Sequence, residues 1–162
     1  MDSLIKTAKT QFFLSFAMLE NLIEQCPDEV WDIKAGGFVF WQQLLHALTG
    51  TGFWMRQPEG GFSEPFSDRK VYPELDHVPE GRITKDEMIE LKNTVKTLCE
   101  GFFEGRDDGW ITQPSWIYDK ISNLDVVFGQ IRHIQYHVGH CDGILRERGL
   151  AAGEWLDWYG EG

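Results

Sequence analysis

Apolar residues recur three or four positions apart in four separate stretches of this 162-residue sequence. That spacing is typical of helices that bury one face, and no stretch keeps the alternation of a half-buried strand. The first stretch covers about residues 3–25 and ends before Pro27, which cannot continue a helix. The second covers about residues 38–57 and ends at Pro58. The sequence therefore predicts an all-α protein.

Two further helices are predicted in the second half of the chain. Thr84 and Glu87 have the spacing of a capping box, which begins a helix that ends near Gly105. The last helix begins near Ser122 and ends at Gly149, a residue type common just beyond helix C-termini. Residues 58–83, rich in proline and glycine, lie between helices two and three. We expect one domain, residues 1–162, folded as a four-helix bundle with one long crossover loop between helices two and three.

Composition restricts the partners and the location. The formal net charge is −11 at pH 7, so nucleic acid and anionic membranes would repel the chain and are not expected as partners. The three cysteines are widely spaced without a C-x-x-C pair, which is typical of a reduced protein. No signal peptide begins the sequence and no apolar run approaches the ~20 residues of a membrane span, so we expect a cytoplasmic protein.

Helix one is rich in large apolar residues on more than one face, which favours a homodimer unless both faces pack within one chain.

Three of the five histidines lie in the last predicted helix. His133 and His137 are four residues apart, so their Cβ atoms should be ~5–6 Å apart on one face. That separation allows two imidazole nitrogens to bind one metal ion at ~2.0–2.1 Å each. His140 lies about 10 Å along the axis from His133. We therefore expect His140 to support the metal site or contact the substrate, without binding the metal.

A third ligand is available in the second helix. His46 shares its helix face with Gly50, which would leave space for a metal and a small ligand. Three histidines with one position open are typical of a catalytic metal site. However, an H-x-x-x-H spacing also arises by chance, and a single histidine such as His46 is often a hydrogen-bonded core residue. Spacing alone leaves both interpretations open, and His77 is expected to be a solvated loop residue.

No carboxylate has a spacing that marks it as a general base. Three acidic residues of the long loop could reach a site: Glu64, Asp68 and Asp76. Asp142 and Glu147 are expected to be surface charges on the last helix. A di-iron carboxylate site would need Glu-x-x-His pairs on two helices, and helices two and four contain none.

Three segments carry a resemblance to a known family: "CPDEVWDIKAGGFVFWQQLLHALTGTGFW", "HIQYHVGHCDGILRERG" and the closing "EWLDWYGEG". They are similar to the DinB/YfiT-like superfamily of metal-dependent enzymes, and with the helix order the likeness spans nearly the whole chain. The resemblance implies a divalent metal bound by His46, His133 and His137. Characterised relatives transfer or isomerise groups with low-molecular-weight thiols such as bacillithiol or mycothiol. Relatives often carry glutamine where this chain has His140, which could change the preferred substrate or metal.

These features predict metal chemistry at three neutral imidazoles. Such ligands leave the ion its full +2 charge, which acidifies a bound water or thiol. Imidazole suits zinc and nickel, which we expect first, and also iron and copper. We expect an enzyme that activates a low-molecular-weight thiol or water for transfer to, or hydrolysis of, a small substrate. The alternative is a non-catalytic metal- or ligand-binding or stress-response protein, and a substrate-sized cleft at the metal would favour the enzyme.

Overall fold

The computed structural model describes residues 3–157, and most of them are helical. The helices are α1 (Leu4–Gln25), α2 (Asp28–Trp31), α3 (Phe40–Trp54), α4 (Lys85–Phe103), α5 (Asp108–Ile111) and α6 (Asn123–Glu147). Strands β1 (Lys34–Ala35) and β2 (Phe38–Val39) form a small antiparallel hairpin before α3. The prediction of a mainly helical protein is confirmed. The hairpin, α2 and α5 were not predicted, because elements this short produce no readable periodicity.

Local side-chain chemistry begins three of the long helices. The Thr84 hydroxyl accepts a hydrogen bond from the Glu87 N–H, while the Glu87 carboxylate accepts one from the Thr84 N–H, so the predicted capping box is confirmed. Ser122 and Asp125 form the same arrangement at the start of α6, and Ser3 caps α1. These bonds satisfy backbone donors that a helix leaves free at its first turn. In contrast, α3 begins two residues later than predicted, because residues 38 and 39 pair with β1.

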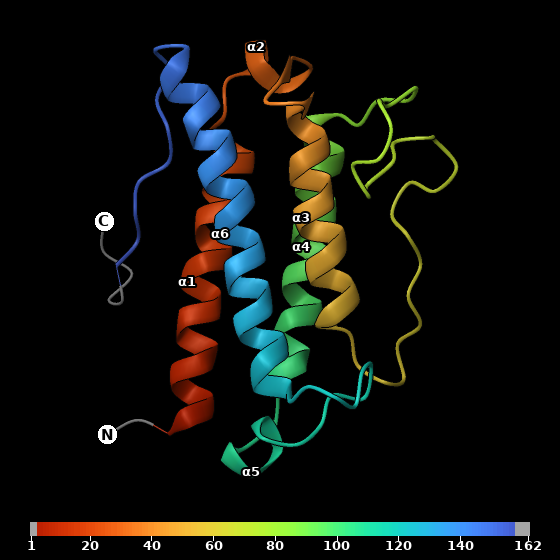
Figure 1. Cartoon of the computed structure of the whole chain (residues 1–162), viewed down its shortest axis with the longest axis vertical. Helices are drawn as coiled ribbons and strands as arrows, with labels where there is room; N and C mark the ends of the chain where they lie inside the picture. The colour runs from red at the N-terminus through yellow and green to blue at the C-terminus, as the bar shows by residue number, and fades with distance from the viewer. Residues whose placement is uncertain (1–2, 158–162) are drawn as a thin grey trace.

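The four long helices lie side by side, as Figure 1 shows. α6 packs against α1 and α3, and α4 packs against the same two helices. α1 and α6 run in one direction, while α3 and α4 run in the other (Figure 1). Because α3 and α4 are parallel, the chain must return along the length of α3 between them. Residues 55–84 make this return without any helix or strand, on the side of α3 away from α1 (Figure 1).

The helices enclose an apolar core rich in aromatic rings. On α1, Phe12, Phe16 and Leu19 are fully buried, and Phe13 packs against Phe12 and Phe103. Burying each such side chain contributes about 1.5–3 kcal/mol. The apolar faces of α1 that suggested a homodimer are thus covered within one chain, and the homodimer stays a prediction. None of the helices within residues 3–157 has the length and apolar character needed to cross a membrane.

One polar residue of α6 differs from its prediction. Asp142, expected to be a surface charge, is only 5% exposed, and its carboxylate accepts a hydrogen bond from the Gly153 N–H at 3.1 Å. The segment after α6 therefore folds back and covers the carboxyl, and burial raises its pKa. Glu147 and His77 are exposed, as predicted. Residues 158–162, the end of the "EWLDWYGEG" motif, lie outside the described residues.

Candidate metal centre

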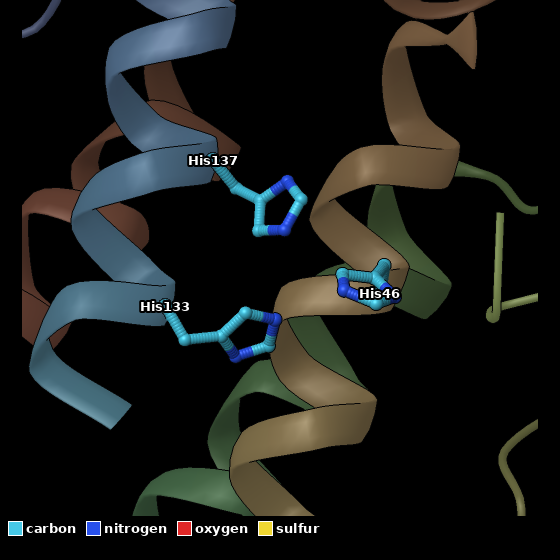
Figure 2. Close-up of side chains that lie close together, drawn as sticks. All are labelled: His46, His133 and His137. Carbon is cyan, nitrogen blue, oxygen red and sulfur yellow. The ribbon is translucent and has the colours of Figure 1, made fainter. Parts of the chain in front are cut away.

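The three predicted ligands come together between α3 and α6. His133 and His137 point from α6 toward α3, where His46 faces them (Figure 2). One ring nitrogen from each lies within 4.8 Å of the other two, and the ring centroids are 4.6–5.0 Å apart. The nitrogens of a tetrahedral zinc site lie roughly 3.3 Å from one another. Small side-chain rotations would therefore bring all three rings onto one ion.

Each of the three imidazoles is hydrogen-bonded through its Nδ1 atom to a carbonyl oxygen. The partner of His46 is the backbone oxygen of Pro73, at 2.7 Å. His137 is 3.0 Å from Oε1 of Gln43, and His133 is 3.2 Å from Oε1 of Gln130. A carbonyl oxygen can only accept, so every Nδ1 must carry the proton. Every Nε2 is then left with a free lone pair, which is the tautomer that metal ligation through Nε2 requires.

The environment keeps the imidazoles of His133 and His137 neutral. His137 is 5% exposed, and His46 and His133 are half-buried. Burial, reinforced by the neighbouring histidines, lowers the pKa of His133 to about 4 and that of His137 to about 3. At neutral pH these rings therefore offer lone pairs to a cation without first releasing a proton.

A glycine on α3 lets the rings approach so closely. Gly50 lies one turn beyond His46, where the sequence suggested open space for a metal and ligand. The His133 ring occupies this position, because a Cβ atom on Gly50 would lie 2.6 Å from its Cε1 atom. The glycine thus makes room for the His133 side chain, which the sequence did not suggest, and it also lines an open space beside His46.

A cavity of about 310 Å³ adjoins the histidines. Its walls come from α3 and from the loop: His46, Thr49, Gly50, Phe53, Phe62, Glu64, Pro73 and Glu74. The Phe53 and Phe62 rings meet edge to face at 5.2 Å. The guanidinium of Arg56 lies 3.9 Å from the Phe53 centroid and 5.8 Å from that of Phe62. This stacking holds the loop against α3, and the volume of the cavity suits a small molecule.

Of the three acidic loop residues considered from the sequence, Glu64 lines this cavity. Its carboxyl is hydrogen-bonded to that of Glu74, and burial together with this neighbour raises the pKa of Glu64. Asp76 lines a different cavity, and Asp68 is exposed. Glu74 was not predicted, because its position depends on the path of the loop. The Glu64–Glu74 pair places two carboxyl groups on the wall of the cavity.

His140 lies apart from the three-histidine cluster. Its ring packs against the turn between β1 and β2, where a Cβ on Gly36 would lie 2.0 Å from its Nε2 atom. It lines a separate groove with Gly139 and Gly143. As a nearby imidazole it helps to lower the pKa of His137, after burial and the other two histidines of the cluster. A role of His140 in supporting the metal site or contacting substrate stays a prediction.

The hydrogen-bond acceptors of the site were not predicted. Gln130 lies three residues before His133, so its place on the same helix face was readable from the spacing. Gln43 is 94 residues from His137 in the sequence, and Pro73 is 27 residues from His46. No local pattern connects such distant positions.

Comparisons of the chain with protein-family models, curated proteins and solved structures found no match. The resemblance to the DinB/YfiT-like superfamily therefore stays a prediction that rests on the motifs quoted above.

Proposed function

We propose that this protein is a DinB-like metalloenzyme that binds one divalent ion through Nε2 of His46, His133 and His137. In this proposal α1, α3, α4 and α6 form the four-helix bundle, and residues 55–84 are its crossover. The observation that carries the proposal is the bonding of all three Nδ1 atoms to carbonyl oxygens. A single core histidine is satisfied by one hydrogen-bond partner of any kind. Here three neighbouring rings all have the tautomer that leaves Nε2 with a free lone pair, and this arrangement suits a cation.

The surrounding residues suit activation of a small nucleophile. When bound, a divalent ion with three neutral ligands supplies a +2 charge that acidifies a water or thiol. The 310 Å³ cavity would hold the substrate beside His46, and Glu64 would exchange protons with it. Because the cavity is large enough for a small molecule, it favours catalysis over a non-catalytic metal- or ligand-binding or stress-response role.

The reacting thiol, if the nucleophile is a thiol, is supplied by a co-substrate. All three cysteines are buried and free of disulfides. Burial raises the pKa of each, that of Cys26 to about 11. Thiolates are the reactive form, so these side chains stay inert. We propose a low-molecular-weight thiol or water as the nucleophile, attacking a small substrate.

Elemental analysis of the purified protein tests the metal site. We expect about one ion per chain, zinc or nickel before iron or copper. The variants His46→Ala, His133→Ala and His137→Ala should each lose it. His77→Ala is the matched control, because His77 is an exposed loop histidine and its loss should leave the metal in place. Metal retained in all three ligand variants would contradict the proposal, and chelated protein with undiminished turnover would contradict its enzymatic part.

A further inference from the structure

The loop of residues 55–84 contributes one hydrogen bond to the histidine cluster, from the carbonyl of Pro73. One buried side chain holds that part of the loop in place. Gln42 on α3 is 1% exposed, and its Nε2 donates to the backbone oxygens of Tyr72 at 2.9 Å and His77 at 2.8 Å. The oxygen of Val71 lies at 3.5 Å from the same nitrogen. A single amide therefore gathers carbonyls from the two ends of residues 71–77, a segment that we call the Pro73 turn.

The backbone of this turn is not one the chain adopts readily by itself. Tyr72 and Leu75 in the turn have φ values of 49° and 63°, and Lys70 just before it has one of 51°. This is a left-handed conformation that residues other than glycine rarely adopt. Such conformations persist where surrounding contacts impose them. The bonds from Gln42 and the bond from His46 to the Pro73 carbonyl are contacts of this kind, and both reach the turn from α3. Gln42 precedes His46 by four residues on α3. The same helix face therefore carries both the side chain that holds the Pro73 turn and the histidine that bonds to its carbonyl.

We infer that Gln42 is a positioning residue of the metal centre, and that metal binding at His46 is coupled to closure of the Pro73 turn. This inference rests on the proposed metal site. The turn orients the His46 ring and fixes its tautomer, and outer partners of this kind change metal affinity about 10–100-fold. By thermodynamic reciprocity, the ion stabilises the closed turn by the same factor.

The coupling extends to the cavity. Phe62, Glu64 and Glu74 reach the cavity from the same loop, so closure of the loop completes the wall opposite α3. Metal loading would then favour the closed loop, and with it the complete wall of the cavity where substrate binds.

Zinc affinity, measured by competition with a chromophoric chelator, tests the role of Gln42. We expect Gln42→Leu, which has no donor, and Gln42→Glu, which has none when ionised, to weaken binding about tenfold or more. Gln57→Leu is the matched control, because Gln57 Nε2 donates to the backbone oxygen of Gly101 at 2.7 Å, away from the histidines. This control should keep wild-type affinity. Cobalt absorption spectra should change for the Gln42 variants alone, since a merely structural loss would leave the ligand field intact.

Limited trypsin digestion tests the coupling in the unaltered protein. Arg69 and Lys70 precede the Pro73 turn, and their side chains are 39% and 66% exposed. Zinc should slow cleavage there several-fold in the wild type and in Gln57→Leu, but not in Gln42→Leu. Cleavage after the exposed Lys120 corrects for any effect of zinc on the protease.

The outcomes separate this inference from the proposed function. If the wild type binds zinc but is cleaved at Arg69 and Lys70 at the same rate with and without it, the coupling is wrong and the proposed metal site is unaffected. Wild-type zinc affinity in folded Gln42→Leu and Gln42→Glu would overturn the positioning role. A wild type that binds no divalent ion would instead overturn the proposed function, and the inference with it.

Discussion

Gly50 on α3 lies directly against the imidazole of His133 on α6, so closely that a Cβ at Gly50 would stand 2.6 Å from the Cε1 atom of the ring. Real Cβ atoms do not approach other heavy atoms this closely. The contact therefore sets how near the two ligand-bearing helices can bring their histidines.

Gly50→Ala should weaken metal binding about tenfold or more, because the added methyl group displaces the His133 ring. Alanine stabilises a helix by about 1 kcal/mol relative to glycine. The melting temperature of the variant should therefore not fall below that of the wild type. Zinc titration with parallel calorimetry checks this. Gly52→Ala is the control, since its Cβ would meet Val95 at an ordinary 3.5 Å. Equal zinc affinity in the two variants would contradict the prediction.

Gln43→Leu should reduce metal affinity about 10–100-fold, because His137 loses the acceptor that fixes its tautomer. Gln43→Glu should bind metal as well as the wild type, since a carboxylate still accepts the Nδ1–H bond. That substitution also sacrifices no hydrogen bond, because Nε2 of Gln43 has no partner among the described residues. Chelator competition measures both variants. A Leu variant that binds as tightly as the Glu variant would show that the bond does not matter.

The metal-free protein should lose stability as the pH falls below about 6.5. The folded pKa values of His133 and His137, about 4 and about 3, lie below the usual 6.5, so the unfolded chain binds more protons in this range. Each histidine then contributes a slope of up to about 1.4 kcal/mol per pH unit. Urea denaturation with a chelator between pH 7.5 and 4.5 measures it. The slope should be smaller in His137→Gln than in the wild type, and identical slopes would count against the assignment.

Asp142→Asn should be more stable than the wild type at pH 7. Burial raises the folded pKa of Asp142, so the carboxyl favours folding at low pH and this contribution is lost as the pH rises through the folded pKa. Asparagine keeps an oxygen for the Gly153 N–H without burying a charge. The gain should shrink toward pH 4, and Glu147→Gln, at an exposed position, should change little. Urea denaturation at the two pH values checks this, and a less stable Asn variant at pH 7 would refute it.

The expected homodimer is tested by light scattering on the purified protein. A mass near 18.7 kDa, that of one chain, would contradict it.

Features of this molecule that depend on neighbouring residues could be predicted from the sequence. The starts of α4 and α6 follow from capping boxes that span three residues, Thr84 to Glu87 and Ser122 to Asp125. The shared direction of His133 and His137 follows from the pitch of a single helix. Each of these features depends on residues within about one helical turn of each other, so a short stretch of sequence determines it.

The remainder was decided by contacts between residues far apart in the chain. The bond from His46 to Pro73, the bond from His137 to Gln43 and the pairing of Glu64 with Glu74 all depend on the paths of α6 and of the loop around α3. Asp142 is buried because the segment after α6 folds back over it. The sequence by itself determined which imidazoles were available on which helix faces. Only the tertiary structure decided which nitrogen of the His46 and His137 rings is free, because the carbonyl groups that bind their Nδ1 protons come from separate elements. No local signal in the sequence shows that these elements meet.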